Sequence, residues 1–252
     1  MPYLTANSLN LTIDNKVILQ DVSFSVNKGE FLSILGPSGC GKTTIMRILI
    51  GLQKPNNGNV TLEDKDITNA VPSKRNMGIV FQNYALFENM TVYENIAYAA
   101  KIKYDDYKEN VNKLISVMGL EEHKNKKPFE LSGGQQQRVA IARTLAVKPD
   151  IILFDEPMSA LDVDTKLELR RELKDLQRKF GSTMIYITHD QEEAFSMSDR
   201  VMVMSEGKIH QIATPEEVVE HPADDYVKRF VVDNLMIKIN SLLEHTRGIY
   251  EK

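Results

Sequence analysis

Nine residues near the start of the chain, Gly36 to Thr44, have the types and spacing needed to bind a phosphate group, and they read GPSGCGKTT. Glycines let the backbone curl tightly, so that consecutive N–H groups point at an anion. Lys42 can reach the β- and γ-phosphates of a nucleotide, and the Thr43 hydroxyl can ligate a bridging Mg²⁺. An apolar run precedes this stretch and a helical apolar pattern follows it, which together predict a phosphate-binding P-loop.

The simpler alternative for this stretch is a glycine-rich turn with an incidental lysine. The adjoining strand and helix patterns favour the phosphate site, because a helix N-terminus adds partial positive charge. Cys40 is interpreted as a small packing residue rather than a nucleophile, since no histidine or acid neighbours it in sequence. The residues expected to contact the nucleotide are Gly36, Pro37, Ser38, Gly39, Cys40, Gly41, Lys42, Thr43 and Thr44.

Two acids, Asp155 and Glu156, come at the end of the apolar run 151–154, which is typical of a parallel strand buried on both faces. Ligands collect at the carboxyl ends of parallel strands, so these acids should lie close to the P-loop. We expect Asp155 to be a Mg²⁺ partner and Glu156 to orient or deprotonate the attacking water. The alternative is a solvated pair that merely caps the strand.

Two other strand ends carry polar side chains, His189 and Gln82. The ring of His189 could face a γ-phosphate, or it could be structural. Gln82 could contact the metal or the water, or only end its strand. The four other histidines lie in polar surroundings and are assigned no role: His123, His210, His221 and His245.

A second glycine-bearing loop, LSGGQ at Leu131 to Gln135, precedes a helix. It is a second anion site of the same kind. Either it binds a second phosphate group or it meets the first nucleotide from the other side, and the residues alone leave both readings open.

Alternating and apolar segments predict the elements that must position these residues. Extended patterns from Leu4 to Val26, with a turn at Asp14-Asn15, suggest an antiparallel layer ahead of the P-loop strand. Further strands are expected at 59–62, 78–82, 151–154 and 184–188, and a closing hairpin at 201–204 and 209–212.

Helical patterns fill most of the rest. The stretch from Met90 to about Leu120 is helical, with one amphipathic face at Val111, Leu114, Ile115 and Met118. Asp190 with Glu193 resembles a capping box that starts a helix. Other segments are expected as follows: a helix after LSGGQ, one ended by Gly181, small helices near 215–219 and 226–230, a short helical tail to Lys252, and a basic linker at 124–127.

Bulk properties bound the class of protein. A chain of 252 residues suits one large α/β domain, and a net charge of −4 with a pI near 5.8 argues against a nonspecific nucleic-acid partner. One cysteine excludes a disulfide framework, and the first residues lack a secretory signal, which predicts a cytoplasmic protein. No apolar run is long enough to cross a bilayer, so any membrane role needs a partner.

The motifs together resemble the ATP-binding cassette ATPases, over about Leu4 to Phe230. Their order and spacing match that family: GPSGCGKTT, VFQ at Val80–Gln82, LSGGQQQR at Leu131–Arg138, ILFDEP at Ile152–Pro157, SALD at Ser159–Asp162 and THD at Thr188–Asp190. The resemblance implies an α/β fold: a P-loop NTPase core with a mostly parallel sheet, an N-terminal antiparallel β layer and an inserted α-helical subdomain. The implied bounds are one cassette domain at 1–235, with core residues about 1–87 and 150–235, a helical subdomain about 88–149, and a tail at 236–252.

The resemblance also implies roles. Two copies would pack head to tail, so that Ser132, Gly133, Gly134 and Gln135 of one close over ATP held by the P-loop of the other. Thr43, Gln82 and Asp155 would hold Mg²⁺, Glu156 would be the catalytic base, and His189 would be the switch residue on the γ-phosphate. Asp162 belongs to the loop that contacts the opposite subunit.

Membrane partners follow from the same resemblance. The run Asn83 to Phe87 is apolar enough to be core, but in this family it lies in a groove that receives a helix of the membrane subunit. MTVYENIA at Met90–Ala97 resembles the importer branch. The implied system has integral membrane permease subunits, an extracytoplasmic solute-binding protein, and this ATPase bound peripherally at the cytoplasmic face.

Three other classes of protein share some of these motifs. An exporter subunit is the most serious alternative, and a soluble non-transport cassette ATPase is disfavoured, since the chain has neither a long coiled-coil insertion nor a second cassette. A non-hydrolytic sensor is disfavoured by Asp155, Glu156 and His189.

The chain departs from the family's pattern in two places. Ile13 stands at or near the place of an aromatic residue that stacks on adenine, which predicts weaker base discrimination. Only a short tail follows Phe230, so no regulatory domain is expected. The sequence does not identify the transported solute.

Overall fold

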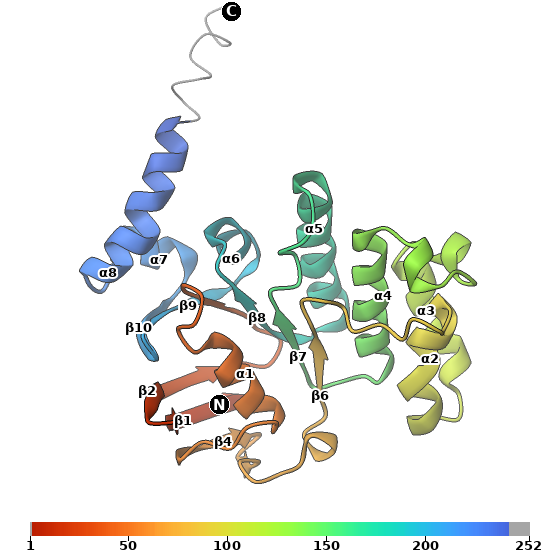
Figure 1. Cartoon of the computed structure of the whole chain (residues 1–252), viewed down its shortest axis with the longest axis horizontal. Coiled ribbons are helices and arrows are strands. Elements are labelled where there is room, and N and C mark those ends of the chain that lie inside the picture. Colours follow the sequence, from red (N-terminus) through yellow and green to blue (C-terminus); the bar gives the residue numbers. More distant parts are fainter. Residues whose placement is uncertain (1, 242–252) are drawn as a thin grey trace, which may run out of the picture.

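The computed structural model describes residues 2–241, and its centre is a six-stranded sheet (Figure 1). The strand order is β10-β9-β3-β8-β7-β6, with β10 antiparallel to β9 and the other neighbours parallel. The strands are β3 (Phe31–Leu35), β6 (Met77–Val80), β7 (Ile151–Asp155), β8 (Thr183–Thr188), β9 (Arg200–Ser205) and β10 (Lys208–Ala213). The mostly parallel sheet expected from the sequence is confirmed.

A second sheet is antiparallel, with the order β2-β1-β4-β5. Its strands are β1 (Leu4–Ile13), β2 (Lys16–Val26), β4 (Asn57–Leu62) and β5 (Lys65–Asp66). The predicted turn at Asp14-Asn15 joins β1 to β2, and both turn residues have positive φ, as a tight hairpin requires. The N-terminal antiparallel layer is therefore confirmed.

The labelled α-helices are α1 (Lys42–Ile50), α2 (Val92–Lys103), α3 (Tyr107–Val117), α4 (Gly133–Ala146), α5 (Val163–Phe180), α6 (Gln191–Met197), α7 (Pro215–Glu220) and α8 (Asp225–Val227). Short 3-10 turns lie at Pro72–Lys74, Glu121–His123 and Pro128–Glu130, and a π-helical stretch at Lys228–Asp233 leads into a helix at 234–241. None of the helices in this part of the chain is long and apolar enough to span a membrane.

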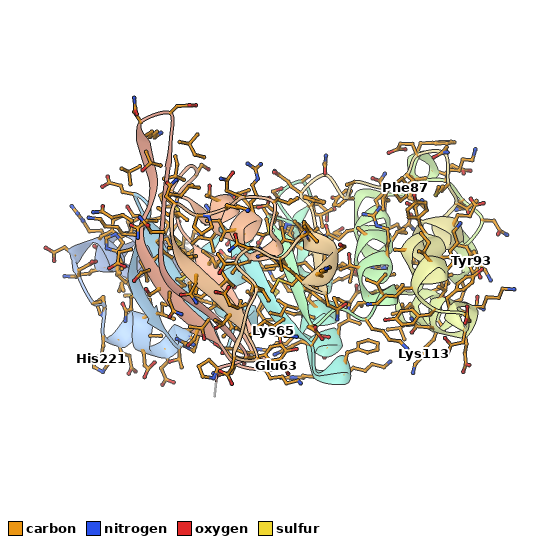
Figure 2. The ribbon with its side chains drawn as sticks, turned by 90° about the horizontal axis from the view of Figure 1, so that it is seen from below. Glu63, Lys65, Phe87, Tyr93, Lys113 and His221 are labelled. Atoms are coloured by element: carbon orange, nitrogen blue, oxygen red, sulfur yellow. The ribbon has the colours of Figure 1, made fainter. Side chains whose placement is uncertain are left out.

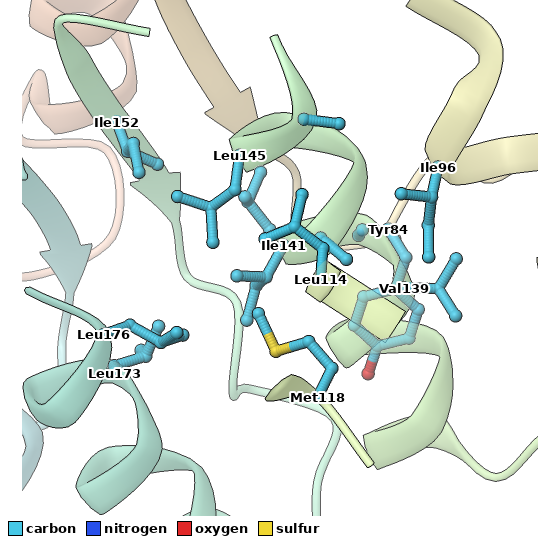
Figure 3. Packing of buried hydrophobic residues seen from close by; sticks show 14 of the residues in the cluster. Tyr84, Ile96, Leu114, Met118, Val139, Ile141, Leu145, Ile152, Leu173 and Leu176 are labelled. Atoms are coloured by element: carbon cyan, nitrogen blue, oxygen red, sulfur yellow. The ribbon is translucent and has the colours of Figure 1, made fainter. Parts of the chain in front are cut away.

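The apolar run of β7 is buried on both faces, as predicted. Ile152 and Phe154 belong to the core that the helices α2 to α5 share with the sheet, whereas Ile151 and Leu153 belong to the core beneath α1 and the antiparallel sheet. Figure 3 shows the first of these cores, with Ile152 at one edge and Ile96 of α2 at the other. The period-2 alternation of a strand thus joins two hydrophobic layers.

One local expectation, the capping box at Asp190 and Glu193, needs correction. Asp190 caps α6, since its Oδ1 accepts from the N–H groups of Glu192 and Glu193, but the Glu193 side chain does not close a capping box. It turns inward to hydroxyl groups of β8, because those donors are buried and require an acceptor.

The basic stretch 124–127 joins two 3-10 turns, as the expected linker would, and it is also bound to α2. The carbonyl groups of Lys124 and Lys126 accept from the first N–H groups of α2, and the Lys124 ammonium lies 4.8 Å from the centroid of the Tyr93 ring. These contacts satisfy donors that a helix start leaves free. The expected helical tail is described as far as 241; His245 and the remainder to Lys252 lie outside the described residues.

Candidate active site for nucleotide hydrolysis

The carboxyl ends of four neighbouring parallel strands bring the predicted catalytic residues to one edge of the sheet. Leu35 pairs with Thr188, and Asp155 pairs with Ile187, so β3, β8 and β7 end at the same level. The P-loop therefore lies next to His189, and His189 next to the acids. Gln82, beyond the end of β6, completes this row.

Backbone geometry of the P-loop fits an anion. Gly39 and Gly41 have φ of 79° and 107°, values that favour glycine. A Cβ on Gly41 would lie 2.8 Å from Leu19 Cδ2, so a larger residue would also clash. Gly41 caps α1 without a side-chain hydrogen bond, which leaves the first N–H groups of that helix to a ligand.

Lys42 is 4% exposed and points into its own loop, where Nζ donates to the Gly36 and Pro37 carbonyls at 2.8 and 3.0 Å. Nζ also lies 3.8 Å from Glu156 Oε1. Beside this ammonium is a cavity of about 240 Å³, lined by Ile18, Ser38, Gly39, Gly41, Lys42, Thr43, Thr44 and Glu156. A cavity with a buried cation and free N–H groups suits the phosphates of a nucleotide.

Thr43 and Asp155 form the candidate metal site. The Thr43 hydroxyl lies 3.2 Å from Asp155 Oδ1, across the gap between the P-loop and β7. Burial raises the pKa of the Asp155 carboxyl, the nearby Glu156 raises it further, and the Thr43 hydrogen bond acts in the opposite direction. A half-buried carboxylate beside a threonine hydroxyl is a site that a hard cation would stabilise.

Glu156 is held in an unusual backbone conformation, with φ of +46°. Such conformations cost free energy in non-glycine residues and are frequent at active sites. Glu156 Oε2 lies 2.8 Å from His189 Nδ1, and the Glu156 carbonyl accepts from Ser159 Oγ at 3.0 Å. Gln82 Nε2 in turn donates to Ser159 Oγ at 3.0 Å, so the glutamine is linked to the glutamate through one hydroxyl.

The LSGGQ loop is built differently. Ser132 and Gln135 form a full capping box at the start of α4. A Cβ on Gly134 would lie 2.7 Å from Thr165 Cγ2, and one on Gly133 would lie 3.2 Å from Leu161 Cδ2. These glycines therefore let α4 pack closely on the start of α5, a reason for glycine that the anion hypothesis did not supply.

Asp162 is the N-cap of α5. Its carboxylate accepts from the Thr165 N–H at 3.0 Å and from the Thr165 hydroxyl at 2.7 Å, and these bonds lower the pKa of Asp162. The structure thus places the SALD loop beside the LSGGQ loop of the same chain. Among the described residues that line the P-loop cavity, none comes from 131–135 or from the SALD loop.

One histidine that received no role from the sequence contacts the LSGGQ loop. His123 Nε2 lies 2.9 Å from Gln135 Nε2. The Gln135 oxygen already accepts from the Ser132 N–H, so the amide nitrogen is the donor to the ring. The sequence places His123 in a short segment before the loop, but its spacing does not indicate a contact with Gln135.

The segment after Gln82 is partly core and partly surface. Tyr84 is buried, and its carbonyl and that of Ala85 accept from Arg143 of α4 at 2.9 and 2.7 Å. Phe87 is exposed and its ring centroid lies 4.5 Å from that of Tyr98. Figure 2 shows Phe87 at the end of the molecule formed by the helices α2 to α4, far from His221. The core reading of the run 83–87 therefore holds for Tyr84, and the exposed Phe87 is left for the contact with a membrane subunit, which stays a prediction.

Ile13 does not line the P-loop cavity among the described residues; it is 42% exposed at the end of β1, and Ile18 of β2 supplies the apolar wall. An aliphatic wall contacts a base but offers no ring for stacking.

A nucleotide-hydrolysing P-loop ATPase of the cassette type is the class that this fold and site define. Residues 19–159 match the sequence model of a family described as ABC transporter. The spermidine/putrescine import ATP-binding protein PotA of Bacillus cereus is 48% identical over 227 residues, which cover 89% of this chain and 69% of that protein. The chain therefore belongs to the ABC transporter family, as an ATPase subunit of its import branch.

Other relatives agree. PotA of Thermotoga maritima is 49% identical over 228 residues, 89% of this chain and 62% of that protein. PotA of Mycoplasma capricolum subsp. capricolum is 47% identical over 237 residues, 93% of this chain and 68% of that protein. A solved structure of cbiO1 from Clostridium perfringens, part of the ABC transporter complex cbiONQ, has a TM-score of 0.82 at 30% identity and covers 96% of this chain and 99% of that one.

Proposed function

We propose that this chain is the ATPase subunit of a polyamine importer. The observation that carries the hydrolytic part is the convergence of Lys42, Asp155, Glu156 and His189 at one edge of the sheet, with the contacts given above. The polyamine part rests on the relatives, which are named for import of spermidine and putrescine.

Each residue has a proposed task in hydrolysis. Lys42 and the N–H groups at the start of α1 bind the β- and γ-phosphates. Glu156 takes the proton of the attacking water, and His189 orients Glu156 and contacts the γ-phosphate. Gln82 contributes through Ser159 to the placement of Glu156.

Mg²⁺ fits the donor set of this site, since one hydroxyl and one half-buried carboxylate are typical protein ligands for it. When bound, it neutralises charge on the phosphates. Thr43 and Asp155 would hold it, with Gln82 as a third oxygen donor. The raised pKa of Asp155 supports this assignment, because a cation favours the ionised carboxylate.

Two copies would complete each site. Support comes from the P-loop cavity, whose described lining lacks the LSGGQ loop, and from the capped and exposed start of α4 at Ser132. In the proposed head-to-tail dimer, Ser132, Gly133, Gly134 and Gln135 of one copy close over ATP in the other, with Asp162 at the contact. The second reading, a separate phosphate site at LSGGQ, is thereby set aside.

The membrane side of the system is proposed from the surface of the helical end. Residues 1–87 and 150–235 would form the core, and 88–149 a helical subdomain that moves with the permease subunits. The exposed Phe87 and Tyr98 are suited to receive a helix of a permease subunit. The chain would then sit peripherally on the cytoplasmic face, and a solute-binding protein would deliver the polyamine outside.

A transport assay tests the proposal. The chain is reconstituted in proteoliposomes with its permease subunits and solute-binding protein, and uptake of radiolabelled spermidine is measured with ATP inside. We expect uptake that depends on ATP and is lost with Glu156→Gln. ATP-dependent uptake of another solute but not of polyamines would contradict the polyamine assignment and leave the ATPase assignment standing.

A further inference from the structure

Glu193 is a buried carboxylate directly behind the switch histidine. Its exposed fraction is 3%, although it lies in the first turn of α6, where acids usually face solvent. Oε2 accepts from Tyr186 Oη and Thr188 Oγ1, both at 2.8 Å. Oε1 lies 3.5 Å from Lys166 Nζ. The carboxylate therefore joins β8, α6 and α5 at one point.

The contacts of Glu193 fix the backbone on both sides of His189. Thr188 precedes the histidine and donates its hydroxyl to Glu193. Asp190 follows it, and the Asp190 N–H donates to the same Thr188 oxygen at 2.9 Å. The His189 side chain is 55% exposed, so little packing holds the ring. The 2.8 Å distance between His189 Nδ1 and Glu156 Oε2 must then depend on how the backbone of His189 is anchored.

Lys166 extends this link to the SALD loop. The residue lies in the first turn of α5, and its N–H donates to the Asp162 carbonyl at 3.0 Å. Its ammonium therefore connects the end of the SALD loop to the carboxylate behind His189. A shift of α5 would move Glu193, and through it the end of β8.

A small polar cavity lies among these groups. Its volume is about 40 Å³, which is enough for ordered water, and its lining is Glu156, Ser159, Lys166, Thr188, His189, Asp190 and Glu193. No apolar side chain is among these described lining residues. The support for Glu156 and His189 on this side is thus made of hydrogen bonds and charge, which depend strongly on the identity of each group.

Stability alone explains this arrangement poorly. A buried ion pair is commonly no more stabilising than apolar residues of the same volume. Burial, with Glu193 nearby, raises the pKa of Tyr186 well above its ordinary value, so this hydroxyl keeps its proton and acts as a fixed donor. A charge held by two fixed donors and a lysine defines a position more sharply than apolar packing would.

We propose that Glu193 is a positioning residue for ATP hydrolysis: with Lys166 it holds His189 against Glu156 and links this pair to the SALD loop. The inference rests on the proposed roles of Glu156 and His189. It adds a route by which the start of α5, which would face the second copy, sets the geometry of the catalytic pair.

Steady-state ATPase assays of the full chain test this role. Glu193→Gln keeps the size of the side chain and removes its charge. We expect kcat to fall by about 10- to 100-fold, as small misplacements of catalytic groups do, with KM for ATP and the affinity for a fluorescent ATP analogue within about twofold. Lys166→Met should give a similar loss, and Lys166→Arg should keep most of the activity. In ¹⁵N NMR spectra, the His189 Nδ1 signal of Glu193→Gln should move toward that of an imidazole without this hydrogen bond.

A matched control lies on the same helix. Lys174 of α5 donates to the Ser196 carbonyl of α6 at 3.3 Å, so Lys174→Met removes another α5–α6 link but not the one to Glu193. It should leave kcat unchanged. The double variant Glu193→Gln/Lys166→Met should lose no more than the worse single variant, because both remove the same link.

Several outcomes would overturn the inference. They are a wild-type kcat in Glu193→Gln or in Lys166→Met, a rise of KM in proportion to the loss, or losses in the two variants that multiply. A failure of the proposed function looks different: Glu156→Gln or His189→Ala would then hydrolyse ATP normally, whatever Glu193 does.

Discussion

The Thr43 hydroxyl lies 3.2 Å from Asp155 Oδ1, and this contact joins the P-loop to the end of β7. The two oxygens come from segments more than a hundred residues apart, yet both are ligand types that Mg²⁺ prefers. Between them they define where a metal would sit relative to the phosphates. Because burial raises the pKa of Asp155, the stability that the protein loses by ionising this carboxyl without a metal can be measured.

Asp155→Asn should stabilise the protein in the absence of nucleotide and Mg²⁺. Burial raises the pKa of Asp155, so the folded protein binds this proton more tightly than the unfolded chain does. The folding stability contributed by this group therefore falls as pH rises from the unfolded pKa, about 3.9, through the folded one, and the penalty is complete once the pH is above the folded pKa. Asparagine carries no charge, so the Asp155→Asn variant avoids this loss of folding stability.

Thermal unfolding at several pH values measures this effect. The unfolding temperature of Asp155→Asn should exceed that of the wild type at pH 7.5, and the gap should narrow as the pH approaches 4. With Mg²⁺ and ATP added, only the wild type should gain much stability. A variant less stable than the wild type without ligands would contradict the inference that burial destabilises the ionised Asp155 carboxylate.

Glu156→Gln should abolish turnover and leave ATP binding intact, since loss of a general base commonly costs about 10²- to 10⁴-fold in rate. The amide can still lie close to His189 and Lys42, so the loop should keep its shape. Phosphate release and equilibrium binding of a fluorescent ATP analogue separate the two effects. Lys42→Ala should instead weaken binding itself, which makes it the contrasting variant.

Gly134→Ala should weaken both folding and hydrolysis, because the new methyl group would lie 2.7 Å from Thr165 Cγ2. Overpacking of this kind typically costs about 1–3 kcal/mol. Thr165→Ser removes that methyl group and keeps the hydroxyl that binds Asp162. The double variant should therefore recover much of the stability, as measured by urea unfolding.

The result for hydrolysis separates two reasons for glycine at this position. Recovery of activity in the double variant would mean that close packing of α4 on α5 explains Gly134. Recovery of stability without activity would mean that the bound nucleotide also needs the space. No recovery of stability would contradict the contact with Thr165.

Much of this site could be predicted from the sequence. The P-loop, the acids after β7 and the histidine after β8 are all local signals, because each polar residue directly follows an apolar strand. The topology of a parallel sheet then places such ends together. Contacts between side chains that are distant in sequence carry no such signal, and they account for the misses.

Glu193 illustrates the limit. Its spacing from Asp190 predicted a capping box, and the N-cap itself is confirmed. The Glu193 carboxylate instead accepts hydrogen bonds from buried hydroxyl groups of β8. His123 is a second case, since nothing in its own neighbourhood indicates Gln135, twelve residues further on. In both, tertiary packing decides the partner of a polar group.

Base selectivity follows from the aliphatic lining of the P-loop cavity, where Ile18 supplies the apolar wall. With no aromatic ring in the described lining of the P-loop cavity, ATP and GTP should be hydrolysed with similar kcat/KM. Base–aromatic stacking is worth about 1–3 kcal/mol, so Ile18→Tyr, in the wall of the cavity, should lower KM for ATP. A strong preference of the wild type for ATP would contradict the expectation of weak discrimination.

His123→Leu tests the contact with the LSGGQ loop. The variant removes the acceptor of the Gln135 amide, so it should cost about 1 kcal/mol of folding free energy. It should also lower ATPase activity, because Gln135 would hold the capping box with Ser132 less firmly.

His123 Nδ1 is buried without a hydrogen-bond partner within residues 2–241, so leucine would remove an unpaired donor as well, which offsets part of the loss of stability. A matched control is His221→Leu, at an exposed residue far from Phe87 and Tyr93 at the helical end of the molecule (Figure 2), which should leave activity unchanged. Equal activity of the two variants would show that the ring of His123 does not position the loop.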